Sequence, residues 1–154
     1  MTEIAAYRLV KQKWKSVAFD GEGARLYGGR WNSRGKSAVY LAGSESLAIL
    51  EIMVHLNDYR LLASYVMYEV RFPADQVEDL PQNRIPPDWR AEPAPSSTAE
   101  TGDAWLDQNA GLALVVPSVI IPREKNYLLN PHHPLFEGVI KSATELDFAP
   151  DRRL

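Results

Sequence analysis

The chain has 154 residues, of which 45% are hydrophobic and 24% are charged, and these values fit one globular domain over residues 1–154. The net charge of -3 at pH 7 disfavours direct binding to nucleic acid, which needs a densely positive surface. The absence of cysteine excludes disulfides and thiolate metal sites, and without a signal pattern or an apolar run of about 20 residues we expect a cytoplasmic protein outside the membrane.

Strand and helix patterns alternate along the chain. Strands are predicted over residues 5–10, 37–42, 64–72, 112–117, 119–121, 126–134 (ending in a turn) and 146–148. Helices are predicted over residues 45–56 and 97–108, and residues 136–142 are predicted as a short helix or strand. The first helix should begin after Ser44 as N-cap, and the second at a capping box formed by Ser97 and Glu100. Glycines make residues 20–35 a long loop, and the Pro- and Ala-rich segment 86–97 a surface connection.

One stretch of the sequence combines a loop, a strand and a helix that each carry a reactive side chain. Gly28 and Gly29 bend the loop that presents Arg30, Tyr40 lies on the strand that follows, and Glu51 lies on the first predicted helix. An arginine, a tyrosine and a glutamate are thus brought close together in sequence. This set suits an anionic substrate with a reacting sugar better than it suits a plain core.

Glu51 is the only charged residue in an apolar run that almost surrounds the predicted helix, so we expect that helix to be buried. A carboxylate in such a place is costly unless it is paired, hydrogen-bonded or facing a cavity. Two interpretations are open: a structural ion pair with one of three arginines, or a functional carboxylate. The three arginines are Arg30, Arg8 and Arg25. His55 follows on the same helix face and is expected to be a packed or capping histidine.

Two phosphate-binding motifs are incomplete in the glycine-rich region. Gly21 and Gly23 begin a dinucleotide fingerprint, but Leu26 occupies the position of its third glycine. Gly35-Lys36-Ser37 has the form of the end of a P-loop, but Arg30 occupies the first glycine position and a strand follows where a helix should begin. We therefore reject both motifs.

Two other polar positions remain. Ser118 follows a proline in an apolar run, which predicts a bulge or an edge, and its simplest role is to bond the backbone. His132 and His133 are adjacent, lack a third ligand at a sensible spacing, and cannot easily point to one metal from a strand. No metal site is expected.

The ordered set of motifs resembles the RES-domain toxins of bacterial RES–Xre type II toxin–antitoxin pairs. The matching pieces are Ala6–Leu9, Asp20–Ala24, Gly28–Asn32, Ala38–Ala42, Ser46–Glu51, His55, Gly102–Trp105, Val116–Ser118, Asn126–His133 and Asp151–Leu154. Each piece alone is weak, but together they span nearly the whole chain in the right order. The family is named for an arginine, a glutamate and a serine, which fall on Arg30, Glu51 and Ser118; its active-site tyrosine falls on Tyr40.

The resemblance implies an α+β fold with a mixed β-sheet core and helices, similar to that of ADP-ribosyltransferases and enclosing an NAD cleft. It further implies consumption of NAD+ by hydrolysis or phosphorolysis of the nicotinamide–ribose bond. An Xre-type DNA-binding antitoxin would block that cleft, and homodimerisation is a family expectation. Two alternatives stay open: an ADP-ribosyltransferase that modifies a protein, and a non-catalytic binding module.

The chemistry of this reaction assigns roles to the catalytic candidates. Arg30 should hold the pyrophosphate bidentately, helped by the backbone N–H groups of Gly28 and Gly29. The carboxylate of Glu51 should accept ribose hydroxyls and stabilise the cationic sugar. Tyr40 should stack on nicotinamide or bond the ribose. Ser118 should orient the amide or a ribose hydroxyl.

Overall fold

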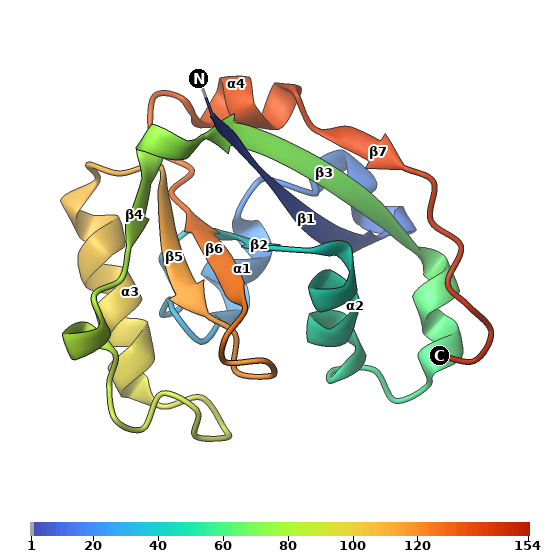
Figure 1. Ribbon diagram of the computed structural model, residues 1–154, viewed down its shortest axis with the longest axis horizontal. Helices are drawn as coiled ribbons and strands as arrows, with labels where there is room; N and C mark the ends of the chain where they lie inside the picture. The colour runs from blue at the N-terminus through green and yellow to red at the C-terminus, as the bar shows by residue number, and fades with distance from the viewer. Residues whose placement is uncertain (1) are drawn as a thin grey trace.

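The computed structural model describes residues 2–154, which form one seven-stranded sheet with helices on both faces (Figure 1). The strands are β1 (Glu3–Lys11), β2 (Val39–Ala42), β3 (Tyr65–Pro73), β4 (Val77–Asp79), β5 (Ala113–Pro117), β6 (Lys125–Leu129) and β7 (Thr144–Leu146). The α-helices are α1 (Glu22–Tyr27), α2 (Glu45–Met53), α3 (Ser96–Gln108) and α4 (Phe136–Lys141). Four 3-10 helices connect them: η1 (Gln12–Val17), η2 (Tyr59–Ser64), η3 (Ala74–Gln76) and η4 (Gln82–Arg84).

The sheet has the order β4-β5-β6-β2-β1-β3-β7 and is mixed. β4 pairs with β5 in parallel, whereas every other neighbouring pair is antiparallel. The longest ladder joins β1 to β3 over nine residue pairs, from Glu3 opposite Pro73 to Lys11 opposite Tyr65. None of the helices of residues 2–154 is long and apolar enough to cross a membrane.

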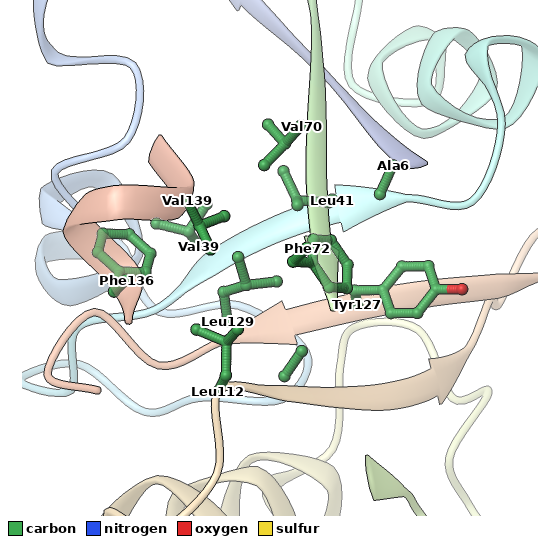
Figure 2. Packing of buried hydrophobic residues seen from close by; sticks show 11 residues of the cluster. Ala6, Val39, Leu41, Val70, Phe72, Leu112, Tyr127, Leu129, Phe136 and Val139 are labelled. Carbon is green, nitrogen blue, oxygen red and sulfur yellow. The ribbon is translucent and has the colours of Figure 1, made fainter. Parts of the chain in front are cut away.

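The two faces of the sheet bury different side chains because neighbouring residues of a strand point to opposite sides. On one face, Phe136 and Val139 of α4 pack on a cluster from the central strands (Figure 2). Its strand members include Val39, Leu41, Phe72, Tyr127 and Leu129. On the other face, α3 packs on β5 and β6, and α2 packs beside it on β1 and β2. This second face also carries Tyr40.

Several predicted elements are confirmed, and others are corrected. Ser44 caps α2, since its Oγ accepts a hydrogen bond from the backbone N–H of Leu47 at 3.1 Å. That helix, however, ends at Met53, and one side of it is open to solvent, where Leu50 is 37% exposed. The predicted burial of the whole helix is therefore wrong, because its apolar residues also cover a surface.

Local hydrogen bonding explains the other differences. The loop predicted over residues 20–35 contains α1, which lies between Gly21 and Gly28, both with positive φ. Residues 119–121 are no strand, because the Oγ of Ser118 accepts the N–H groups of Ile120 and Ile121 and turns the chain. No side chain caps α3, whose N-cap residue is Pro95, and Ser97 instead donates to Asp88 at 2.6 Å. The short strand β4 lies outside the strands predicted from the sequence.

Helix α3 approaches the Arg30 loop so closely that one of its residues must be glycine. A Cβ built on Gly102 would lie 1.6 Å from the carbonyl oxygen of Trp31, which is a backbone atom. Trp31 is itself buried and packs with Trp105 of the same helix. The missing side chain of Gly102 therefore sets the position of the loop that carries Arg30.

We expect Gly102→Ala to destabilise the protein by about 1–3 kcal/mol, because α3 must move away from a backbone obstacle. Gly138→Ala in α4 is the matched control: a Cβ at Gly138 would meet nothing within 4 Å, and its φ is not in the left-handed region. Alanine there should stabilise the protein by about 0.5–1 kcal/mol. Urea unfolding of both variants tests this, and equal free energies of unfolding would contradict the close approach.

Candidate active site

Glu51 is held by two neutral hydrogen-bond donors. Its Oε1 accepts from the hydroxyl of Ser118 at 2.8 Å and from Nδ2 of Asn126 at 2.8 Å. Its Oε2 accepts no hydrogen bond from any of residues 2–154, and this oxygen is not fully buried. The carboxylate is half-buried. One oxygen of Glu51 is thus fixed by the protein, and the other remains for a substrate.

The three arginines that could have neutralised Glu51 all bind elsewhere. Arg25 pairs with Glu22 one turn away on α1. Arg8 lies on the opposite face of the sheet and donates to the carbonyl oxygens of Ala18 at 2.8 Å and Tyr40 at 3.1 Å. Within residues 2–154, Glu51 forms no ion pair. The interpretation of Glu51 as a structural ion pair is therefore wrong.

Ser118 combines the backbone role expected for it with a contact to the candidate catalytic residue. Its side chain is completely buried, and its Oγ accepts the N–H groups of Ile120 and Ile121, both at 3.1 Å. The same hydroxyl donates its hydrogen to Glu51. Because the two N–H groups use the oxygen as an acceptor, they orient the hydroxyl hydrogen toward the carboxylate.

Tyr40 joins the sheet to the Arg30 loop. Its phenol oxygen accepts the backbone N–H of Trp31 at 3.0 Å and donates to Oδ1 of Asn32 at 2.6 Å. Asn32 is itself buried, and its Nδ2 donates to backbone carbonyls including that of Ala24 at 2.9 Å. Burial raises the pKa of the Tyr40 phenol above its ordinary value, so the group stays protonated at neutral pH.

The register of the sheet places Tyr40 beside the Glu51 cluster. On neighbouring strands, Tyr40 lies opposite Leu128 and Ala42 lies opposite Asn126, so Tyr40 and Asn126 are diagonal neighbours on one face. Helix α2 covers that face at Ala42 and brings Glu51 to Asn126. Tyr40 therefore lies one diagonal step along the sheet from the group of Asn126, Glu51 and Ser118, whose side chains are joined by hydrogen bonds.

Arg30 binds the strap, which we define as residues 86–95. Its Nη1 donates to the carbonyl oxygens of Trp89 at 2.9 Å and Ala91 at 2.8 Å, and its Nη2 pairs with Oε2 of Glu92 at 2.7 Å. The strap is anchored through Trp89, which packs against the cluster under α3. In Figure 1 the strap lies below α3, and the 118–124 loop, which joins β5 to β6, lies between the strap and α2 in this view.

The strap also reaches the Glu51 side of the site. Nη2 of Arg90 donates to the carbonyl oxygen of Val119 at 2.9 Å, next to Ser118. Arg30 and Glu51 make no direct contact among the described residues, but Arg90, Val119 and Ser118 connect the strap to the carboxylate. A hollow of about 810 Å³ lies at the C-terminal end of α2 and one of about 220 Å³ at its N-terminal end, and neither is lined by Arg30 or Glu51.

The two loop glycines shape the turn through their conformations and their lack of side chains. The N–H of Gly28 donates to Ala24 at 2.8 Å and that of Gly29 to the carbonyl oxygen of Asn32 at 3.0 Å, so both groups are engaged inside the loop. Gly28 has a φ of 73°. A Cβ on Gly29 would lie 2.8 Å from the Tyr40 phenol oxygen, so glycine keeps the contact between Tyr40 and Asn32 open.

The chain matches known proteins along almost its whole length. The model of the RES domain family matches residues 5–151. The chain belongs to the RES-domain toxin family. It is 43% identical to the protein named Toxin Res from Photorhabdus laumondii, over 96% of this chain and 95% of the relative. It is 39% identical to the Prs ADP-ribosylating toxin of a Sphingobium species, over 77% of this chain and 76% of the relative.

A solved structure shows the same fold. The RES-domain chain aligns with a chain in the crystal structure of the M. tuberculosis MbcT–MbcA toxin–antitoxin complex with a TM-score of 0.68 and 21% identity, covering 94% of this chain and 85% of that one. The predicted α+β fold with a mixed sheet is confirmed. Within residues 2–154, no three His, Asp or Glu side chains gather closely enough to hold a metal ion.

The sequence predicted the loop, strand and helix that carry the candidate site residues, but two contacts of these residues were missed. Asn126 entered only as part of a motif, without a role, although an asparagine at the start of a strand facing a helix is a usable signal. Glu92 had no signal, because its contact with Arg30 spans 62 positions of the chain. Within residues 2–154, the hydrogen bonds of His132 and His133 are local and join them to Asn130, Leu135 and Phe136.

We expect Tyr40→Phe to destabilise the RES-domain protein by about 1–3 kcal/mol, since it leaves the buried side chain of Asn32 and the N–H of Trp31 without their partner. Tyr27→Phe is the control, because Tyr27 is 76% exposed and its change should stay within about 0.5 kcal/mol. Urea unfolding measures both. A loss no larger for Tyr40→Phe than for Tyr27→Phe would show that the phenol does not hold the loop.

Proposed function

We propose that this RES-domain protein is a toxin that consumes NAD+ by cleaving its nicotinamide–ribose bond, with water or phosphate as the acceptor. The observation that carries the proposal is the state of Glu51: a half-buried carboxylate that is fixed through Oε1 and, among residues 2–154, has no ion-pair partner and no hydrogen bond at Oε2. No arginine of residues 2–154 pairs with this carboxylate, so its charge remains available to a bound group. The 43% identity to a protein named Toxin Res supports the toxin role.

The chemistry requires a negative charge next to the sugar. The nicotinamide nitrogen is positively charged in NAD+, so nicotinamide leaves without a strong general acid. As the bond breaks, positive charge develops on the ribose, and a fixed carboxylate stabilises it. We assign this role to Glu51, with Oε2 directed to the ribose and its hydroxyls. Ser118 and Asn126 hold the carboxylate in place and act as positioning residues.

The other members of the site bind the dinucleotide. Arg30 is assigned to the pyrophosphate, since a guanidinium matches phosphate oxygens bidentately. Gly28 and Gly29 shape the loop that presents Arg30. The phenol oxygen of Tyr40 is engaged with Trp31 and the neighbouring asparagine, so its ring is the part assigned to nicotinamide or ribose.

We propose a cognate antitoxin of the Xre type, a DNA-binding protein that blocks the NAD cleft, as the partner. The likeness to a chain in a solved toxin–antitoxin complex supports a protein partner of this kind. Action on NAD+ and neutralisation by an antitoxin both place the protein in the cytoplasm. Homodimer formation belongs to the same proposal.

A second candidate activity is transfer of ADP-ribose to a protein. It is favoured by the 39% identity to a relative named Prs ADP-ribosylating toxin. The products separate the candidates: free ADP-ribose indicates hydrolysis, a phosphorylated ADP-ribose that requires added phosphate indicates phosphorolysis, and label on an added protein indicates transfer. No release of nicotinamide under any of these conditions would contradict all three.

Glu51→Gln should lower NAD+ turnover by about 100-fold, a loss of roughly 2.7 kcal/mol of transition-state stabilisation, because glutamine keeps the size but removes the charge. Release of nicotinamide from the purified protein measures it. Glu45→Gln on the same helix is the control, since Glu45 is exposed in the first turn, and its turnover should match wild type. Turnover of Glu51→Gln within a few-fold of wild type would refute the role of the carboxylate.

Arg30→Ala should weaken NAD+ binding by about 10-fold or more, the loss expected for a charge-assisted phosphate contact of roughly 1.5–3 kcal/mol. NAD+ titration by calorimetry measures the affinity, and circular dichroism checks that the fold is retained. Arg123→Ala is the control, because Arg123 is exposed and pairs with no carboxylate among residues 2–154. Unchanged affinity in folded Arg30→Ala protein would exclude the pyrophosphate role.

A further inference from the structure

The carboxylate of Glu92 lies at Arg30, where the proposed function places the pyrophosphate. The distance from Nη2 of Arg30 to Oε2 of Glu92 is 2.7 Å. We propose that Glu92 is an internal competitor, which holds the anion-binding edge of Arg30 and must be displaced when a dinucleotide pyrophosphate binds. This inference rests on the proposed function, since it specifies how the same site admits its substrate.

The two edges of the Arg30 guanidinium have different partners. Both hydrogens of Nη1 are used by backbone carbonyls, those of Trp89 and Ala91. One hydrogen of Nη2 is used by Glu92, and Nε has no acceptor among residues 2–154. A guanidinium has five N–H donors, and Nε with Nη2 forms the fork that binds two oxygens of one anion. The strap backbone thus orients Arg30, while Glu92 occupies part of the fork.

Displacing Glu92 requires only that its side chain rotates away. That side chain is 77% exposed, whereas the side chain of Arg30 is 15% exposed. The strap itself stays anchored through Trp89 and through Asp88, which accepts a hydrogen bond from Ser97 of α3 at 2.6 Å. The carbonyl contacts to Nη1 can therefore persist while the carboxylate leaves. Arg30 would then present an oriented fork to the incoming anion.

The ion pair between Glu92 and Arg30 is weak, so it opposes the binding of an anion only slightly. An ion pair with one exposed partner contributes about 0–1 kcal/mol, which corresponds to at most about a fivefold change in affinity. A pyrophosphate has more than one negative charge and several acceptor oxygens, so it outcompetes one carboxylate at the fork. Glu92 therefore reduces the affinity of Arg30 for anions in general without preventing the binding of a dinucleotide.

The test compares Glu92→Gln with Glu137→Gln, using inorganic pyrophosphate and NAD+ as ligands in calorimetry. Glu137 is an exposed carboxylate on α4, on the opposite face of the sheet. Glu137→Gln changes the net charge by the same amount as Glu92→Gln, but far from Arg30. We expect Glu92→Gln to tighten pyrophosphate binding about 2–5-fold and to lower the KM for NAD+ by a similar factor with kcat unchanged. Glu137→Gln should leave both values at wild type.

A double variant makes the test specific to Arg30. In an Arg30→Ala background, adding Glu92→Gln should have no further effect on pyrophosphate affinity, because the contact it relieves is already gone. Three results would overturn the proposal: equal effects of Glu92→Gln and Glu137→Gln, a persistent effect in the Arg30→Ala background, or no pyrophosphate binding by Glu92→Gln protein. Nicotinamide release by wild type is scored separately, so a failure of the proposed function is distinguished from a failure of the competition.

Discussion

The arrangement of this site depends on the way Glu51 is held. A salt bridge would fix a carboxylate equally well, but it would also cancel the field that the carboxylate exerts on its surroundings. Here two neutral groups, a serine hydroxyl and an asparagine amide, donate to the same oxygen. The position of the carboxylate is therefore fixed while its charge is left uncompensated by any side chain of residues 2–154. Stabilisation of a developing cation requires this combination.

The sheet supplies both donors. β5 and β6 pair so that Val116 lies opposite Asn126, and beyond the ladder the N–H of Ser118 bonds the carbonyl of Glu124 at 3.0 Å. The two residues that hold Glu51 thus lie at the same end of one antiparallel pair, and α2 only has to bring the carboxylate to them. Groups on paired strands keep their separation better than groups on loops, so a small shift of the helix does not separate the two donors.

The sequence reveals the parts of the site that depend on local chemistry. The glycine-bent loop, the short strand with Tyr40 and the Ser44-capped helix all follow from neighbouring residues. The burial of α2 was overestimated, because an apolar residue such as Leu50 can lie on a surface as well as in a core. The helix α1 was missed because the glycines at both of its ends were interpreted as a loop.

Contacts between distant segments could not be predicted in the same way. The partners of Arg30 are mostly backbone carbonyls of the strap, and a carbonyl is present at every residue, so it leaves no mark in a sequence. Only the fold decides which carbonyl an arginine meets. The same holds for Gly102, whose necessity depends on the Trp31 carbonyl, 71 positions earlier, that lies where a Cβ would be.

The side chains of Arg30 and Glu51 are held in the same way, and the side chain of Tyr40 is held differently. Each charged group has one part fixed by the protein, Nη1 in the arginine and Oε1 in the glutamate, and another part without a buried partner. The phenol of Tyr40 both donates and accepts within the fold, and burial raises its pKa. It cannot exchange a proton with a substrate without releasing the loop that carries Arg30. Its contribution is therefore to connect the sheet that positions Glu51 to the loop that positions Arg30.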